Sequence, residues 1–119
     1  MDLGCTVLFP TGNSNGAVSY PATLANVISV TAMSMCNQRK STTSCDGETL
    51  WGSNYGVNGD IYPGVKIYTT DISGASGYGT GDYTATFNGT SSACPNAAGV
   101  MALILSINPS LTNTSARQY

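Results

Sequence analysis

Ser91 is the residue whose neighbours best suit nucleophilic chemistry. It follows the short Asn88-Gly89-Thr90 segment and precedes an apolar run of helical character. Small neighbours would let a substrate backbone approach the hydroxyl, and the N-terminus of a helix favours negative charge that develops nearby. A serine hydroxyl remains a weak nucleophile until a neighbouring base accepts its proton. Taken alone, Gly-Thr-Ser before a helix is more often a plain N-cap than a nucleophile.

The segment after Ser91 predicts a helix over residues 91–106. Its apolar residues cover nearly all sides, which is typical of a buried central helix. Pro95 is compatible with this helix only because it lies close to the first turn. Asn108-Pro109 should end the helix, and Ser110 is the expected N-cap of a further helix.

Three runs of β-branched and apolar residues predict strands over 5–9, 26–32 and 65–70. Continuous apolar strands suit a sheet that is covered on both faces, which favours the α/β class. Residues 71–82 form a surface loop rich in Gly, Ser and Tyr, and residues 83–87 alternate like a short extended segment. The chain has no internal repeat and no linker between two domains.

The string Gly89-Thr90-Ser91-Ser92-Ala93-Cys94-Pro95-Asn96-Ala97-Ala98-Gly99 resembles the nucleophile signature of the subtilisin-like serine peptidases, the peptidase S8 or subtilase family. That signature consists of Gly-Thr-Ser, small residues, Pro, and a small pair that ends in Gly. Further segments resemble the family in the same order and with family-like spacing: Phe9-Pro10-Thr11-Gly12-Asn13-Ser14-Asn15-Gly16, Tyr20-Pro21-Ala22, Asn26-Val27-Ile28-Ser29-Val30, Ser53-Asn54-Tyr55-Gly56 and Asp60-Ile61-Tyr62-Pro63-Gly64-Val65.

This resemblance implies an α/β fold with a three-layer parallel sheet, of which only the later strands and the nucleophile helix are present. Residues 1–119 would be the C-terminal portion of a partial peptidase S8 catalytic domain. Ser91 would attack the scissile peptide carbonyl of a protein or peptide substrate. The Asn13 side chain and the backbone N–H of Ser91 would hold the resulting oxyanion. Without the resemblance, Asn13 would be an ordinary turn residue.

The rest of the family's catalytic triad, a His oriented by an Asp, has no counterpart in this sequence. The chain contains no histidine, and no carboxylate lies in the Asp-Ser/Thr-Gly setting that the family uses. We expect an upstream half of the domain to supply both groups, and we expect the isolated chain to be inactive. Three local departures from the family are Pro10 on the substrate-lining strand, Thr31 in place of Gly, and an Asp60 segment that is one residue short.

The amino-acid composition limits which partners the protein can bind and where it can be located. The four Lys plus Arg and six Asp plus Glu give a net charge of −2, and no basic cluster exists, so nucleic acid is a poor candidate. The longest apolar run, residues 97–105, is too short to span a bilayer. Low charge with abundant Gly, Ser, Thr and Asn is common in exported bacterial proteins. We therefore expect a secreted or extracellular protein whose signal and pro-segment are not part of this chain.

The four cysteines predict one disulfide. Cys36 and Cys45 flank a short polar loop, and a bridge between them is favoured over two free thiols. Cys5 and Cys94 lie among apolar or small residues and are expected to be buried free thiols. Without histidine or a two-residue cysteine gap, a structural zinc site is not expected.

No cofactor is required for the expected chemistry, although some family members bind a cation through backbone carbonyls after the Tyr-Pro segment. Such ligands leave no sequence trace, so calcium remains open as a structural ion. The alternative from another class is a non-catalytic secreted binding module rich in Gly, Ser and Tyr, or a pseudoenzyme. The tyrosines are irregularly spaced, which favours packing over a carbohydrate-stacking set.

Overall fold

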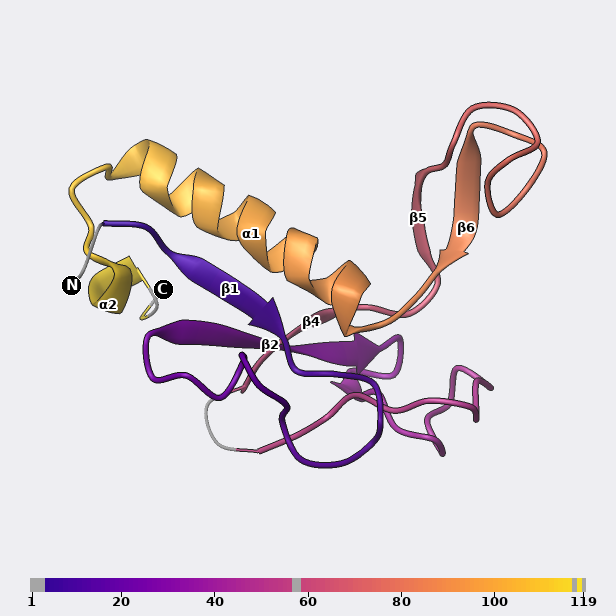
Figure 1. Cartoon of the computed structure of the whole chain (residues 1–119), viewed down its shortest axis with the longest axis horizontal. Helices are drawn as coiled ribbons and strands as arrows, with labels where there is room; N and C mark the ends of the chain where they lie inside the picture. Colours follow the sequence, from indigo (N-terminus) through magenta and orange to yellow (C-terminus); the bar gives the residue numbers. More distant parts are fainter. Residues whose placement is uncertain (1–3, 57–58, 117, 119) are drawn as a thin grey trace.

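The computed structural model describes residues 4–56, 59–116 and 118. One long helix, α1 (Thr90–Ile107), lies across a sheet, and a short helix, α2 (Asn113–Ala116), follows it. Figure 1 shows the loops between the strands on the side of the sheet away from α1, and a hairpin that projects from the body. The strands are β1 (Val7–Pro10), β2 (Val27–Ser34), β3 (Gln38–Arg39), β4 (Gly59–Pro63), β5 (Ile67–Thr70) and β6 (Tyr83–Phe87).

β2 is the central strand of the four-stranded sheet. It pairs in parallel with β1 and with β4, and Ser29 stands opposite Phe9 on one side and Gly59 on the other. β3 pairs antiparallel with the end of β2. Seven of the eight β2 residues are buried, as expected for a strand whose two faces are both covered. The sheet is therefore mixed, with a parallel core, and the α/β class is confirmed.

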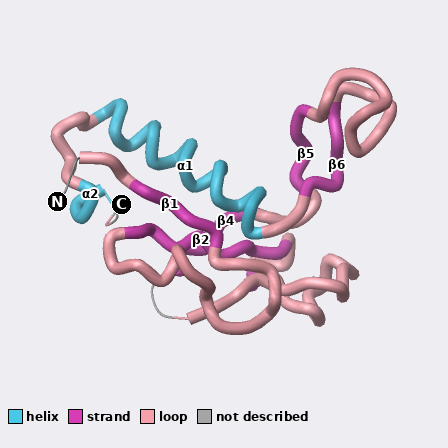
Figure 2. Tube along the Cα trace, in the orientation of Figure 1, coloured by secondary structure: helices cyan, strands magenta, loops and turns pink. Residues whose placement is uncertain are grey.

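The strand expected over 65–70 is confirmed as β5, but β5 does not join the main sheet, where the third parallel strand is β4. The chain turns after Pro63, and Lys66 takes a left-handed backbone conformation with φ of 52°. β5 then pairs antiparallel with β6 in a separate two-stranded sheet (Figure 2). Its alternation of half-buried and exposed residues matches a ribbon that is covered on one face only. The extended segment expected over 83–87 is confirmed as β6.

α1 matches the expected helix to within one residue at each end. Its buried apolar residues Ala93, Ala97 and Met101 recur every fourth position and pack with Ile28, Val30 and Ala32 of β2. The expected burial on nearly all sides is not met among the described residues. The opposite face is open, with exposed fractions of 43% at Val100, 67% at Leu103 and 85% at Ile107.

Length and composition would allow α1 to cross a membrane, since its 18 residues are apolar enough on average. The core helix of a soluble protein passes the same test, and the inner face of α1 packs on the sheet. The expected absence of a membrane partner stays a prediction.

Two smaller expectations need correction. The N-cap of α2 is Thr112, whose hydroxyl accepts a hydrogen bond from the Ser115 amide at 3.2 Å. Ser110 instead donates its hydroxyl hydrogen to Asn108 Oδ1 at 2.7 Å.

The Cys36–Cys45 disulfide is confirmed, and Cys5 and Cys94 are free. Cys5 is exposed and Cys94 is half-buried, so neither thiol has the full burial that their neighbours predicted.

Candidate functional site

Ser91 lies in the first turn of α1 and is exposed. Gly89 precedes the helix with φ of 111°, a conformation that favours glycine. The Gly89 amide donates to the carbonyl of Gly64 at 3.0 Å, and the buried Ser92 hydroxyl donates to the same carbonyl at 3.0 Å. The turn that ends β4 therefore holds the turn that presents Ser91.

Asn13 lies beside this helix N-terminus, 77 positions from Thr90 in the sequence. Its Oδ1 accepts hydrogen bonds from the backbone N–H of Thr90 at 2.9 Å and from the Thr90 hydroxyl at 3.0 Å. The Thr90 hydroxyl also accepts from the Gly12 amide at 3.3 Å, and Thr90 is 1% exposed. Because its oxygen faces Thr90, the amide group of Asn13 has its orientation fixed.

The Nδ2 donor of Asn13 and the backbone N–H of Ser91 flank the same position beside Gly89. A Cβ added to Gly89 would stand 3.3 Å from Asn13 Nδ2 and 3.6 Å from the Ser91 nitrogen. Within the described ranges, Asn13 Nδ2 donates no hydrogen bond to the protein. Two hydrogen-bond donors at the N-terminus of a helix can stabilise an anion. The structure thus brings Ser91 and Asn13 together.

Asn54 positions the Asn13 loop, a role that the sequence reasoning missed. Its Oδ1 accepts from the amides of Ser14 at 2.8 Å and Gly16 at 3.2 Å, and its Nδ2 donates to the Thr11 carbonyl at 3.0 Å. A Cβ on Gly12, whose φ is 105°, would come within 2.5 Å of Asn54 Nδ2. The match of residues 53–56 to the family segment was the signal that could have pointed to Asn54.

The described residues do not bring a base to Ser91. Among them, the Ser91 hydroxyl makes no hydrogen bond to a side chain, and the chain has no histidine. The carboxylate of Asp71 serves its own loop, where it accepts from the amides of Ile72, Tyr78 and Gly79. The Glu48 carboxylate accepts from Asn88 Nδ2 and not from Ser91. The site as described holds a hydroxyl and two amide donors.

A buried ion pair joins Lys40, inside the loop closed by the Cys36–Cys45 disulfide, to Asp46, the residue directly after that loop. Lys40 Nζ stands 3.2 Å from Asp46 Oδ1, and both side chains are fully buried. Burial alone would raise the pKa of Asp46, but the Glu48 amide and the Lys40 ammonium outweigh it and hold that pKa below its ordinary 3.8. Burial raises the pKa of the Cys94 thiol above its ordinary 9.0.

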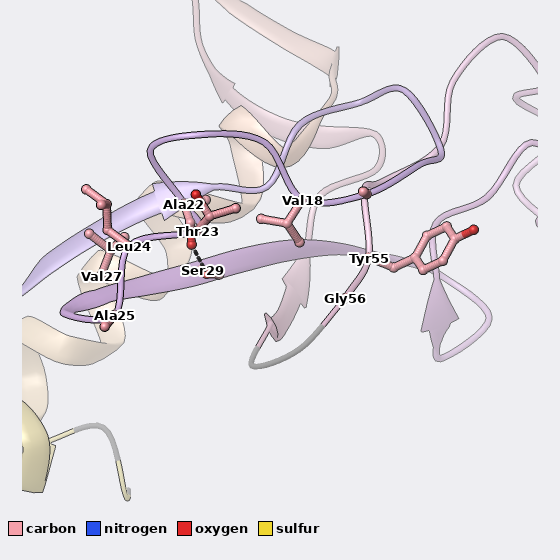
Figure 3. A pocket seen from close by; sticks show the side chains of 10 residues that line it. Val18, Ala22, Thr23, Leu24, Ala25, Val27, Ser29, Tyr55 and Gly56 are labelled. Carbon is pink, nitrogen blue, oxygen red and sulfur yellow. Dashed lines mark hydrogen bonds between the residues drawn. The ribbon is translucent and has the colours of Figure 1, made fainter.

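The segment after Tyr20-Pro21 borders a pocket of about 340 Å³, shown in Figure 3. The Ser29 hydroxyl donates to the Ala22 carbonyl at the base of the pocket. Carboxylates are the side-chain ligands that Ca²⁺ prefers, and the pocket lining contains none. In the described part of the chain, no group of three or more His, Cys, Asp or Glu could hold a metal ion. These side chains do not fit a tight calcium site.

Three relatives are proteases by name. A calcium-dependent protease of Nostoc sp. is 41% identical over 119 residues, covering 91% of this chain and 18% of the relative. An extracellular protease of Xanthomonas campestris pv. campestris is 40% identical, covering 95% and 18%. Subtilisin Savinase of Lederbergia lenta is 37% identical, covering 98% and 37%. This chain therefore spans about a fifth to two fifths of the length of these relatives.

The described residues form an α/β unit, with a parallel-cored sheet and an exposed serine in the first turn of its long helix. The sequence pattern of the Subtilase family matches residues 1–119, and the chain belongs to that family.

Proposed function

We propose that residues 1–119 form the C-terminal part of the catalytic domain of a secreted subtilisin-like serine endopeptidase. Ser91 is the nucleophile, and Asn13 Nδ2 and the Ser91 N–H are the oxyanion donors. The observation that carries this proposal is the pair of hydrogen bonds from Thr90 to Asn13 Oδ1, because they leave the amide donor free beside Ser91.

In the proposed reaction, a base outside this chain accepts the proton of the Ser91 hydroxyl while the oxygen attacks a substrate peptide carbonyl. The carbonyl oxygen becomes an anion, which Asn13 Nδ2 and the Ser91 amide stabilise. Return of the proton to the leaving amine breaks the peptide bond and leaves an acyl-enzyme, which water then hydrolyses. The chemistry needs no cofactor. The name of one relative, a calcium-dependent protease, points to calcium, which would be a structural ion held by backbone carbonyls, because the described side chains form no site for it.

The open surfaces of the described chain support an upstream half that supplies His and Asp. The outer face of α1 exposes the apolar side chains of Leu103 and Ile107. β1 pairs with β2, and no strand of the described residues occupies its other edge. An exposed strand edge and a large apolar face are usually covered in a native protein. The extracellular relative supports secretion.

The test compares this chain with the full-length protein that includes the preceding half of the domain. A fluorophosphonate should label the isolated chain weakly and the full-length protein strongly. Ser91→Ala should abolish both labelling and peptide hydrolysis. The free energy of unfolding should stay within about 1 kcal/mol of that of the unsubstituted protein. A full-length protein with no Ser91-dependent activity would refute the enzyme proposal and leave the pseudoenzyme or binding module.

A further inference from the structure

Glu48 makes hydrogen bonds through its backbone and through both oxygens of its side chain. Its amide donates to Asp46 Oδ1 at 2.9 Å, and its carbonyl accepts from Lys40 Nζ. Its Oε2 accepts from Trp51 Nε1 at 2.8 Å, and its Oε1 accepts from Asn88 Nδ2 at 2.8 Å. A side chain that is held at both oxygens has little freedom, so Glu48 is a rigid anchor for whatever it binds.

Asn88 is the residue directly before Gly89, at the start of the turn that presents Ser91. Its Oδ1 accepts from the Lys66 amide at 2.6 Å, while its Nδ2 donates to Glu48. Lys66 lies in the turn after β4, whose Gly64 carbonyl accepts from the Gly89 amide. Both ends of the Asn88 side chain are thus tied to segments far away in the sequence.

These contacts form a closed ring. Asp46 bonds to the Glu48 amide, Glu48 to Asn88, and Asn88 to Lys66, whose Nζ returns to the Asp46 carbonyl at 3.0 Å. Asp46 is itself fixed by the buried Lys40, which is 0% exposed. The ring therefore links the segment after the disulfide to the turn before Ser91, and the Lys40–Asp46 pair joins the disulfide-closed loop to the ring.

We propose that Glu48 is a positioning residue for the candidate nucleophile: by holding Asn88, it fixes the Gly89 turn and the direction of the Ser91 N–H. This inference rests on the proposed function. A charged acceptor strengthens the Asn88 contact relative to a neutral one. The Ser91 N–H belongs to the turn that Asn88 begins, so a loose Asn88 would let this donor move away from Asn13 Nδ2. Displacements of about 1 Å in such a site can cost on the order of a hundredfold in rate.

Trp51 provides the matched control, because it binds the other oxygen of the same carboxylate. Trp51→Phe removes the Nε1 donor and keeps a ring beside Lys40. If Glu48 only stabilises its own loop, Glu48→Ala and Trp51→Phe should have similar effects everywhere. If Glu48 positions the Ser91 turn through Asn88, only Glu48→Ala and Asn88→Ala should affect that turn.

The experiment uses the full-length protein and two measurements. The first is peptide hydrolysis, where we expect Glu48→Ala to lower kcat about tenfold with KM within about twofold. Asn88→Ala should lower kcat by the same factor. The double variant Glu48→Ala/Asn88→Ala should lower kcat no further than either single variant, because both substitutions break the same contact. Trp51→Phe should keep kcat within about twofold. The second is amide hydrogen exchange, where Glu48→Ala should speed exchange at Gly89 and Ser92 and Trp51→Phe should not.

The two measurements together either support or overturn the role proposed for Glu48. Lower kcat together with faster exchange at Gly89, coupled to Asn88, supports the proposal. Unchanged exchange in Glu48→Ala, or equal effects in Trp51→Phe, overturns it. If the unsubstituted protein shows no Ser91-dependent hydrolysis, the proposed function fails, and the exchange data alone then decide whether Glu48 orders the turn.

Discussion

Asn13 and Thr90 are joined by two hydrogen bonds to a single oxygen, at 2.9 Å from the Thr90 amide and 3.0 Å from its hydroxyl. An amide has one oxygen and one nitrogen end, so fixing the oxygen also fixes the donor. Thr90 is buried, and the Gly12 amide holds its hydroxyl in turn. A donor oriented before substrate arrives loses no free energy to reorganisation during the reaction.

We predict that Asn13→Asp lowers kcat in the full-length protein by about a hundredfold or more, with little change in KM. That size is the one known for loss of the oxyanion-hole asparagine in a subtilisin, the standard example of this effect. Aspartate keeps an oxygen for Thr90 but replaces the donor with a second acceptor, which would repel the oxyanion. Steady-state kinetics on a peptide substrate measures the change.

The control for this prediction is Thr90→Val, which keeps the volume and removes the hydroxyl. It should destabilise the protein by about 1–2 kcal/mol, because the half-buried Gly12 amide loses its acceptor. The loss in kcat should be smaller than for Asn13→Asp, since the Thr90 amide still holds Asn13. A kcat for Asn13→Asp equal to that of the unsubstituted protein would contradict the oxyanion role.

The helix that carries Ser91 and the central strand beneath it could be predicted, because short-range sequence patterns determine where they begin and end. The helix over 91–106 and the strand over 26–32 follow from apolar runs bounded by turn residues, and both agree with α1 and β2. The disulfide could be inferred because Cys36 and Cys45 flank one short loop. The proximity of Asn13 to Ser91 required the family resemblance, since no local rule joins segments so far apart in the sequence.

The remaining features depend on long-range pairing. Residues 59–63 and 65–70 both contain β-branched and aromatic residues, so composition alone does not tell which of them joins the main sheet. In the structure β4 pairs with β2, and β5 follows the left-handed Lys66 and pairs with β6. The open face of α1 could not be predicted either, because periodicity reports which residues are apolar and not what covers them. The link from Glu48 to Asn88 leaves no sequence signal at all.

Gly64→Ala should disturb the turn before Ser91 through steric contact. A Cβ there would stand 2.7 Å from the Ala32 Cβ and 2.9 Å from the Gly89 carbonyl oxygen. Both neighbours belong to packed backbone segments, so we expect a loss of about 1–3 kcal/mol in unfolding free energy. Gly79→Ala is the control, since nothing lies within 4 Å of its added Cβ. Equal unfolding midpoints for the two variants in urea would show that the packing at Gly64 is looser than described.

Asp46 should contribute to the dependence of stability on pH. Its pKa in the folded protein lies below the ordinary 3.8, so the carboxylate stabilises the fold above about pH 4. This contribution is lost as the pH falls from about 4 through the lower folded value. Asp46→Asn should flatten that acid limb and cost about 3 kcal/mol at pH 7, because Lys40 stays buried without its partner. Urea unfolding between about pH 2 and 7 measures both effects, and an unchanged acid limb would contradict the assignment.

Cys94 should be the slower of the two free thiols to react. Thiolate is the reactive form, and burial raises the pKa of Cys94 above 9.0, so less than about a tenth is thiolate at pH 8. Iodoacetamide at pH 8 should therefore modify Cys94 faster after unfolding in urea than in the folded protein. Cys5 is the internal control, because it is already exposed and its rate should change little on unfolding. Mass spectrometry of the two peptides gives both rates, and a Cys94 that reacts equally fast in the folded and unfolded protein would mean that the helix face around it is open to solvent.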